Sequence, residues 1–191
     1  YVEGETLRAR LKREHQLPID EAVRLSVEVA DALDFAHMRE VIHRDIKPEN
    51  ILLHDGHAIV ADFGIARALR RSGTEWTTAA GMAVGSPAYM SPEQASGDRE
   101  IDGRADIYSL ACVLFETLAG EPPFMSRAAH MIIAAKLAGT PRAVRDLRAD
   151  VPAALDAVIA KALARNAQDR FPTARAFSVA LAATVQSSVA I

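Results

Sequence analysis

Four side chains that could act together lie within a short part of the chain. The segment 43–50 reads His-Arg-Asp-Ile-Lys-Pro-Glu-Asn, and a second aspartate, Asp62, follows Asp45 by 17 positions. Asn50 and Asp62 offer hard oxygen donors of the kind that Mg²⁺ binds, and Lys47 places a positive charge two residues after Asp45. Asp45 or Asn50 alone would be an ordinary turn-forming residue. The combination indicates a catalytic centre rather than a set of turns.

The elements around the 43–50 segment are predicted to be a helix before it and a hairpin after it. The helix runs from about Asp20, its expected N-cap, to about Met38. Apolar residues at helical spacing predict its buried stripe, which consists of Leu25, Val29, Leu33 and Ala36. Apolar runs at 51–53 and 58–61 flank His54-Asp55-Gly56-His57, in which Asp-Gly is a hairpin signal.

The second half of the chain is predicted to be helical. Residues 66–90 lack sustained periodicity and are rich in Thr, Ser, Gly and Ala, which indicates a long loop. From Asp106 to Leu118 apolar residues occupy nearly every face, so this helix should be buried all round. Further helices are predicted at about 126–138, 152–164 and 173–185. The expected fold class is therefore mainly α, with a small β-hairpin beside the 43–50 segment.

Composition limits the classes of partner. The 191 residues suit one domain or one large lobe, and the net charge of −3 gives no footprint for nucleic acid or an anionic membrane. The single cysteine excludes an intrachain disulfide, and no apolar run is long enough to span a bilayer. We expect a cytoplasmic protein that binds no nucleic acid and makes no membrane contact through this segment, which leaves open an anchor elsewhere in a longer parent protein.

The 43–50 segment and Asp62-Phe63-Gly64 resemble the catalytic loop and the metal-binding motif of serine/threonine protein kinases. The resemblance implies that Asp45 accepts the hydrogen bond of the substrate hydroxyl and that Lys47 contacts the transferring phosphate. It also implies that Asn50 and Asp62 bind Mg²⁺, or Mn²⁺ in its place, together with ATP. Lys47 at this position favours Ser/Thr over Tyr substrates.

Three further residues have expected structural roles: Glu93 and Arg170 would close the following segment against the late helices, and Asp106 would hold the catalytic loop. Ser91-Pro92-Glu93 resembles the Ala-Pro-Glu motif of the family, with Ser in place of Ala, and Arg170 resembles the partner of that glutamate. Asp106 resembles the aspartate that hydrogen-bonds the backbone of the catalytic loop. The alternatives are two solvated surface charges for Glu93 and Arg170, and a simple N-cap for Asp106.

The segment after Gly64 resembles an activation segment. Ser86 stands where the family usually has Thr, in the part that receives the residue after the phosphoacceptor, and it keeps the hydroxyl. Arg44 resembles the arginine that binds a phosphorylated activation loop, so phosphorylation of Thr77 or Thr78 is predicted to order the segment. A merely polar loop is the alternative.

Three residues that could be taken for functional ones are expected to pack in the protein instead. His43 should lie in the core beneath the site, Phe63 should pack as well, and Cys112 should lie inside the buried helix.

The resemblance implies a kinase domain of which residues 1–185 form the large C-terminal lobe and residues 186–191 a frayed tail. A small lobe needs about five strands and a helix, which the residues before Pro18 cannot supply. No G-x-G-x-x-G motif is present, and Lys12, the only lysine before Lys47, lies in a charged stretch that does not read as a strand. We expect the parent enzyme to phosphorylate Ser/Thr of protein substrates, and this chain alone to be inactive.

Two other functions are considered. One is a non-catalytic binding or scaffold module derived from a kinase, against which the intact set Asp45, Lys47, Asn50 and Asp62 argues. The other is a small-molecule phosphotransferase of kinase-like fold, which is disfavoured because the segment ending in Ser91-Pro92-Glu93 resembles a platform for a protein substrate. The Ser-Pro-Glu-Gln sequence and the high Ala and Arg content resemble bacterial members of the family.

Overall fold

The computed structural model describes residues 4–63, 87–126 and 128–186. Its helices are α1 (Leu7–Glu14), α2 (Ile19–His37), α4 (Pro92–Ser96), α5 (Arg104–Ala119), α6 (Ala129–Ala138), α7 (Ala153–Ala162) and α8 (Ala174–Gln186). Its 3-10 helices are η1 (Pro48–Asn50), η2 (Val144–Asp146) and η3 (Ala167–Asp169), and its strands are β1 (Glu5–Thr6), β2 (Ile51–His54) and β3 (His57–Val60). The expected fold class, mainly α with a small sheet, is confirmed.

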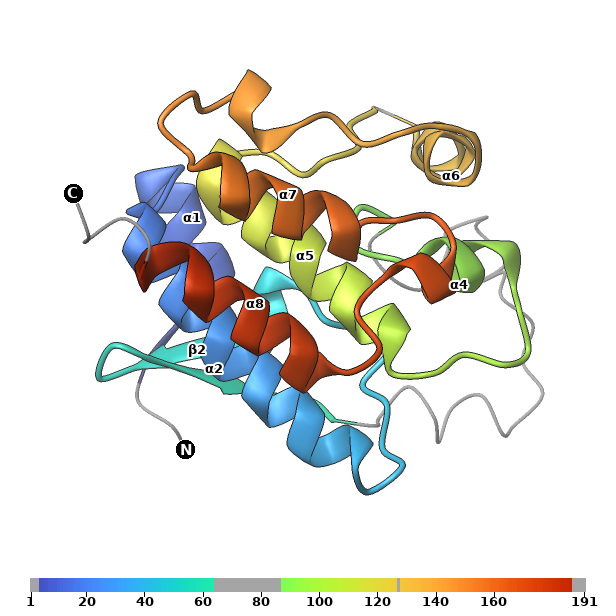
Figure 1. The fold of residues 1–191 in the computed structure, drawn as a ribbon, viewed down its shortest axis with the longest axis horizontal. Helices are drawn as coiled ribbons and strands as arrows, with labels where there is room; N and C mark the ends of the chain where they lie inside the picture. The colour runs from blue at the N-terminus through green and yellow to red at the C-terminus, as the bar shows by residue number, and fades with distance from the viewer. Residues whose placement is uncertain (1–3, 64–86, 127, 187–191) are drawn as a thin grey trace.

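Helix α5 forms the centre of the core. Every residue from Ala105 to Leu118 is buried, as the sequence predicts. Figure 1 shows why: α5 runs through the middle of the molecule and packs against α2, α7 and α8. Its hydroxyl side chains bond within the helix, since Ser109 Oγ donates to the Ala105 carbonyl at 3.0 Å and Thr117 Oγ1 to the Leu114 carbonyl at 2.7 Å.

Helix α2 lies along α8 on one side and against the sheet on the other (Figure 1). Its predicted stripe is buried in full. The predicted N-cap is wrong, because the helix begins at Ile19, Pro18 is the N-cap and Asp20 lies in the first turn. The preset φ of proline suits the start of a helix, and the Pro18 carbonyl accepts the Ala22 N–H at 2.9 Å. None of the helices in the described residues is both long and apolar enough to cross a membrane.

The predicted hairpin is present and belongs to a three-stranded antiparallel sheet of order β1-β2-β3. Asp55 and Gly56 both have positive φ, 49° and 80°, as a two-residue type I′ turn requires. The third strand, β1, was not predicted. It consists of two residues, which pair with Leu52 and Leu53, and a strand of this length is too short to show alternation of apolar and polar residues.

The Glu28 side chain on α2 docks this helix onto β3, which is an edge strand in the described part of the chain. Its Oε2 accepts the Ala58 N–H at 2.6 Å, and its Oε1 lies 3.0 Å from His57 Nδ1. Burial raises the pKa of Glu28, but hydrogen bonds from Ala58, His57 and Arg24 outweigh it and hold this pKa below its usual value.

Helix α1 is the second element that was not predicted. Its signals are weak: Thr6 Oγ1 caps it by accepting the Ala9 N–H at 3.1 Å, and only Leu7 and Leu11, four residues apart, are buried. The arginines between them pair with glutamates outside the helix or at its end, as in the contacts of Arg8 with Glu49 at 2.8 Å and of Arg10 with Glu14 at 2.5 Å.

Candidate active site

The Asp106 carboxylate holds the start of the 43–50 segment. It is buried at the first turn of α5 and accepts the N–H groups of His43 at 2.9 Å and Arg44 at 2.7 Å. It also accepts a hydrogen bond from Nε2 of His37, at the end of α2, at 2.8 Å. The predicted bond to the loop backbone is therefore present. The alternative role as an N-cap is wrong, because α5 begins at Arg104 with Gly103 at that position.

These bonds stabilise an unfavourable backbone. Arg44 has a φ of 69°, in the left-handed region, which costs a residue with a side chain about 1–2 kcal/mol. Two N–H groups that point at one buried carboxylate offset this cost.

His43 packs beneath the site, as predicted. Its ring is buried, its Nε2 donates to the Ala61 carbonyl at 2.8 Å, and its Nδ1 accepts the Asp45 N–H at 3.2 Å. One neutral tautomer satisfies both contacts. Phe63 packs edge-on against this ring at 4.8 Å, as expected, while 38 % of its surface stays exposed.

Asp45, Lys47 and Asn50 form one polar cluster. Asp45 Oδ2 lies 2.6 Å from Lys47 Nζ and 3.1 Å from Asn50 Nδ2, and Asn50 Nδ2 also donates to the Asp45 carbonyl at 2.8 Å. Pro48 opens the 3-10 helix η1, which returns Asn50 to Asp45. Asn50 is buried, whereas Asp45 stays half-buried and accessible to a substrate. A fixed, accessible carboxylate can accept the hydrogen bond of a substrate hydroxyl group.

Asn50 and Asp62 are placed on neighbouring segments. The Ala61 N–H donates to the Asn50 carbonyl at 2.9 Å. Asp62 is the next residue in the chain after Ala61, so its backbone lies close to that of Asn50. Asp62 is exposed and has a φ of 62°. Because the donor end of the Asn50 amide is committed to Asp45, a cation would meet its oxygen. No group of three or more His, Cys, Asp or Glu within the described residues could hold a metal ion, and two oxygen ligands match the few protein contacts of Mg²⁺.

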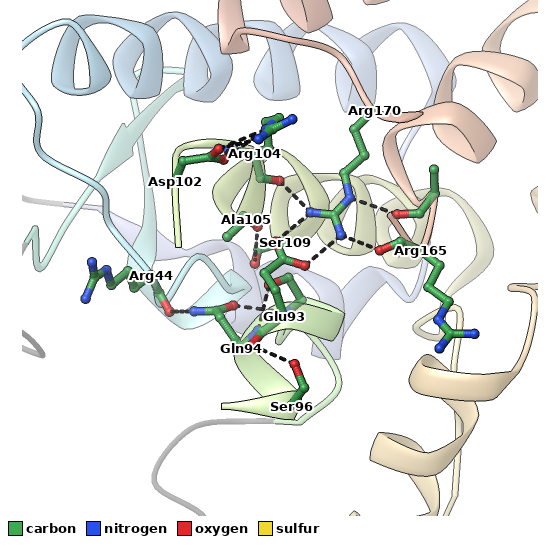
Figure 2. A network of polar contacts seen from close by, with 12 residues as sticks. Arg44, Glu93, Gln94, Ser96, Asp102, Arg104, Ala105, Ser109, Arg165 and Arg170 are labelled. Carbon is green, nitrogen blue, oxygen red and sulfur yellow. Dashed lines mark hydrogen bonds and ion pairs between the residues drawn. The ribbon is translucent and has the colours of Figure 1, made fainter. Parts of the chain in front are cut away.

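Glu93 and Arg170 form the predicted ion pair. Figure 2 shows it as a fork, with NH1 to Oε1 and NH2 to Oε2 both at 2.7 Å. The other three N–H groups of Arg170 donate to the carbonyls of Ala164, Arg165 and Arg104, so all five donors are used. Burial raises the pKa of Glu93, but the Arg170 guanidinium outweighs it and holds this pKa below its usual value.

Two supporting contacts were not predicted from the sequence. Gln94, which caps α4 together with Ser91, donates from Nε2 to the Arg44 carbonyl at 2.8 Å (Figure 2). Arg8 on α1 bonds Glu49 in η1 at 2.8 Å and the buried Glu116 on α5 at 2.8 Å. No local pattern marks these residues, since each partner lies more than 40 positions away in the chain.

A phenol completes the Arg8 contacts. The Tyr89 hydroxyl lies between Arg8 and Glu116 and bonds both. Burial raises the pKa of Tyr89, and the charge of Glu116 raises it further. Gly64, Ser86, Thr77 and Thr78 lie outside the described residues, so their roles stay predictions.

Residues 1–180 match a family described as the protein kinase domain. The chain is 46 % identical over 183 residues to the serine/threonine-protein kinase PknD of Mycobacterium tuberculosis, which covers 94 % of this chain and 27 % of PknD. It is 41 % identical over 175 residues to PknB of Mycobacterium leprae, which covers 91 % of this chain and 28 % of PknB.

This chain belongs to the bacterial serine/threonine protein kinase family. The crystal structure of the Mycobacterium tuberculosis PknI kinase domain is 30 % identical, with a TM-score of 0.72 over 97 % of this chain and 63 % of that domain. ATP and magnesium are typical of the kinase family. The kinase chain described here spans little more than a quarter of the length of PknB and PknD.

We expect Asp106→Asn to loosen the start of the 43–50 segment of this kinase, because an amide offers one acceptor where the carboxylate offers two. The free energy of unfolding in urea should fall by about 1–3 kcal/mol, and amide hydrogen exchange at His43 and Arg44 should accelerate. Asp20→Asn, at an exposed aspartate of α2, should change stability by less than about 0.5 kcal/mol. Unchanged exchange at both amides would contradict the role of Asp106.

We expect Glu93→Gln to lower the free energy of unfolding at pH 7 by about 3 kcal/mol, because it leaves the Arg170 charge buried without its partner. The folded pKa of Glu93 is depressed, so its contribution is complete above the unfolded value of about 4.3 and is lost as pH falls through the folded value. The difference between the two proteins should therefore narrow below about pH 4.

The matched control for this prediction is Glu121→Gln, which breaks the exposed pair with Arg142 at 2.6 Å. Its effect should be about 0–1 kcal/mol at every pH. Equal effects of the two variants at pH 7 would show that burial of the Glu93 pair does not matter.

Proposed function

We propose that this chain supplies the large lobe of a kinase that transfers the terminal phosphoryl group of ATP to Ser or Thr hydroxyls of protein substrates. The observation that carries the proposal is the Asp45 carboxylate, held between Lys47 and Asn50 while still accessible. Serine/threonine-protein kinases PknB and PknD support the choice of hydroxyl. A cytoplasmic location and the lack of nucleic-acid partners stay predictions from composition.

Each residue of the cluster has a distinct proposed role. Asp45 orients the substrate hydroxyl by accepting its hydrogen bond. Lys47, whose ammonium group lies next to Asp45, neutralises charge on the phosphoryl group as it moves to the acceptor. Because Asn50 Nδ2 donates to both the carbonyl and the carboxylate of Asp45, the group that accepts the substrate hydroxyl and the proposed metal ligand keep a fixed spacing.

Asn50 and Asp62 are the proposed ligands of a divalent cation, Mg²⁺ with Mn²⁺ as the alternative. Both present hard oxygen donors, and Mg²⁺ in such sites binds one or two protein groups and the substrate phosphates. The cation supplies positive charge that neutralises the phosphate oxygens. Asp62 is exposed, which leaves it accessible to such a complex.

We also propose that this chain alone is inactive. No Gly-rich phosphate-binding loop is present in its sequence, and Lys12, the only lysine before the 43–50 segment, lies on α1 instead of a strand. The nucleotide phosphates would therefore lack groups that the kinase family places above them. A non-catalytic binding module derived from a kinase remains the second candidate.

We expect a chimera that joins the small lobe of PknD to the start of this chain to transfer radiolabelled phosphate from ATP to a generic Ser/Thr substrate, whereas the chain alone transfers none. Asp45→Asn should lower the rate by about 10²–10⁴-fold, because it removes the group that accepts the hydroxyl proton. Asp20→Asn, on the exposed face of α2, should leave the rate unchanged.

Three results would oppose this proposal in different ways. Transfer by the purified chain alone would overturn its predicted inactivity. A folded chimera that binds ATP but transfers no phosphate would favour the non-catalytic module. An Asp45→Asn chimera that keeps full activity would overturn the role of Asp45.

The active chimera should also carry phosphate on Thr77 or Thr78, since Arg44 beside Asp45 is proposed to bind a phosphorylated segment. Mass spectrometry of the active protein checks this. Absence of phosphate on both threonines, at full peptide coverage, would rule it out.

A further inference from the structure

Lys136 is a buried cation on an otherwise apolar helix. It is the only Lys, Arg, Asp or Glu of α6, and it is also the only residue of α6 that is buried, with 1 % of its surface exposed. Lysine is almost never fully buried without a paired anion. The burial of this side chain in place of its apolar neighbours therefore requires an explanation.

The groups in direct contact with the Lys136 ammonium are uncharged, and burial and repulsion from the Arg170 guanidinium both lower the pKa of Lys136. Nζ donates to the Ala88 carbonyl at 2.8 Å and lies 3.8 Å from Cys112 Sγ. It lies 4.8 Å and 5.3 Å from the ring centres of Tyr108 and Phe124. Within residues 4–63, 87–126 and 128–186 no carboxylate forms an ion pair with it.

The pKa values agree with this description. Burial lowers the pKa of Lys136, and the nearby Cys112 opposes this only in part. Burial likewise raises the pKa of the Cys112 thiol, so that group does not serve as a counter-ion. An anion next to Lys136 would stabilise its charged form.

A cavity of about 230 Å³ adjoins this lysine between α5, α6 and α7. Tyr108 and Phe124, the two rings that border the ammonium, also line the cavity, as do Ile159 and Leu163 of α7. The wall is mainly apolar. Drug-sized ligand sites measure roughly 300–1,000 Å³, so this cavity suits a smaller molecule.

The charges around the cavity favour an anion. Lys136, Arg142 and Arg165 line it, against a single carboxylate, Asp156. Asp156 Oδ1 already accepts the Val144 N–H at 2.9 Å. Arg142 is already paired with Glu121 at 2.6 Å, which leaves Lys136 and Arg165 as the cations without a carboxylate partner in the described residues. A cationic ligand would therefore meet an excess of positive charge, and an ion without an apolar part, such as phosphate, would leave the apolar wall unfilled.

We propose that this cavity binds a small organic anion, with a carboxylate toward Lys136 and a compact apolar body against Ile159 and Leu163. The ligand supplies a counter-ion that the described residues do not provide for the lysine, and it removes apolar wall from water. The cavity contains no residue of the 43–63 region, so the proposal does not depend on the proposed phosphoryl transfer.

Octanoate is a suitable probe, and the chain labelled for methyl NMR is the target. We expect saturable shifts of the Ile159 and Leu163 methyl groups on titration. Octylamine, which has the same apolar body and the opposite charge, should produce no saturable shifts there. Lys136→Met keeps the stem of the side chain and removes the charge, so it should weaken octanoate binding by about tenfold or more.

Two further variants separate charge from shape. Ala160→Leu, at an exposed position on the cavity wall, should abolish binding by filling the space while it keeps the three cations. Lys12→Met, at an exposed lysine of α1, should leave the affinity unchanged.

Several outcomes would overturn the proposal. These are octanoate shifts spread over surface residues without saturation, equal affinity of Lys136→Met and the unchanged chain, equal binding of octylamine, or unchanged affinity in Ala160→Leu. The last test stands even if Lys136→Met fails to fold.

Discussion

The Asp106 carboxylate is the contact on which the site depends most. It lies at the start of the most buried helix and accepts the backbone N–H groups of His43 and Arg44 as well as the His37 ring. Three segments far apart in the sequence therefore meet at one anion. Because α5 is packed on all sides, the position of this anion is fixed by the core, and the core in turn fixes the loop that carries Asp45.

Two buried cations of this chain, Arg170 and Lys136, have different surroundings. Arg170 uses all five N–H groups and faces a carboxylate, so its charge is neutralised where it lies. Lys136 is buried as deeply, but within the described residues its ammonium contacts a carbonyl, a thiol and two rings and no carboxylate. The first arrangement holds α4 against the segment after α7, and the second leaves a positive site beside a cavity.

The sequence was informative where neighbours in the chain determine the structure. The stripe of α2, the Asp55-Gly56 turn and the burial of α5 depend on local periodicity or turn chemistry, and the structure has all three. The Glu93–Arg170 pair was found only because its surroundings resemble a known family. Arg8 and Gln94 had no local signal, because their partners are brought close by the fold alone. The packing of Phe63 was expected, but its 38 % exposure was not, since no local pattern shows how far a side chain after a strand is covered.

The Glu28 carboxylate has a consequence for the behaviour of the chain in solution. In the described part of the chain β3 is an edge strand, and such edges are templates for a strand of a second molecule. The Ala58 N–H that an incoming strand would need is already occupied by Glu28 Oε2. The same carboxylate that docks α2 onto the sheet therefore blocks intermolecular β-pairing at this position, and protonation of Glu28 in acid would weaken its bond to the Ala58 N–H.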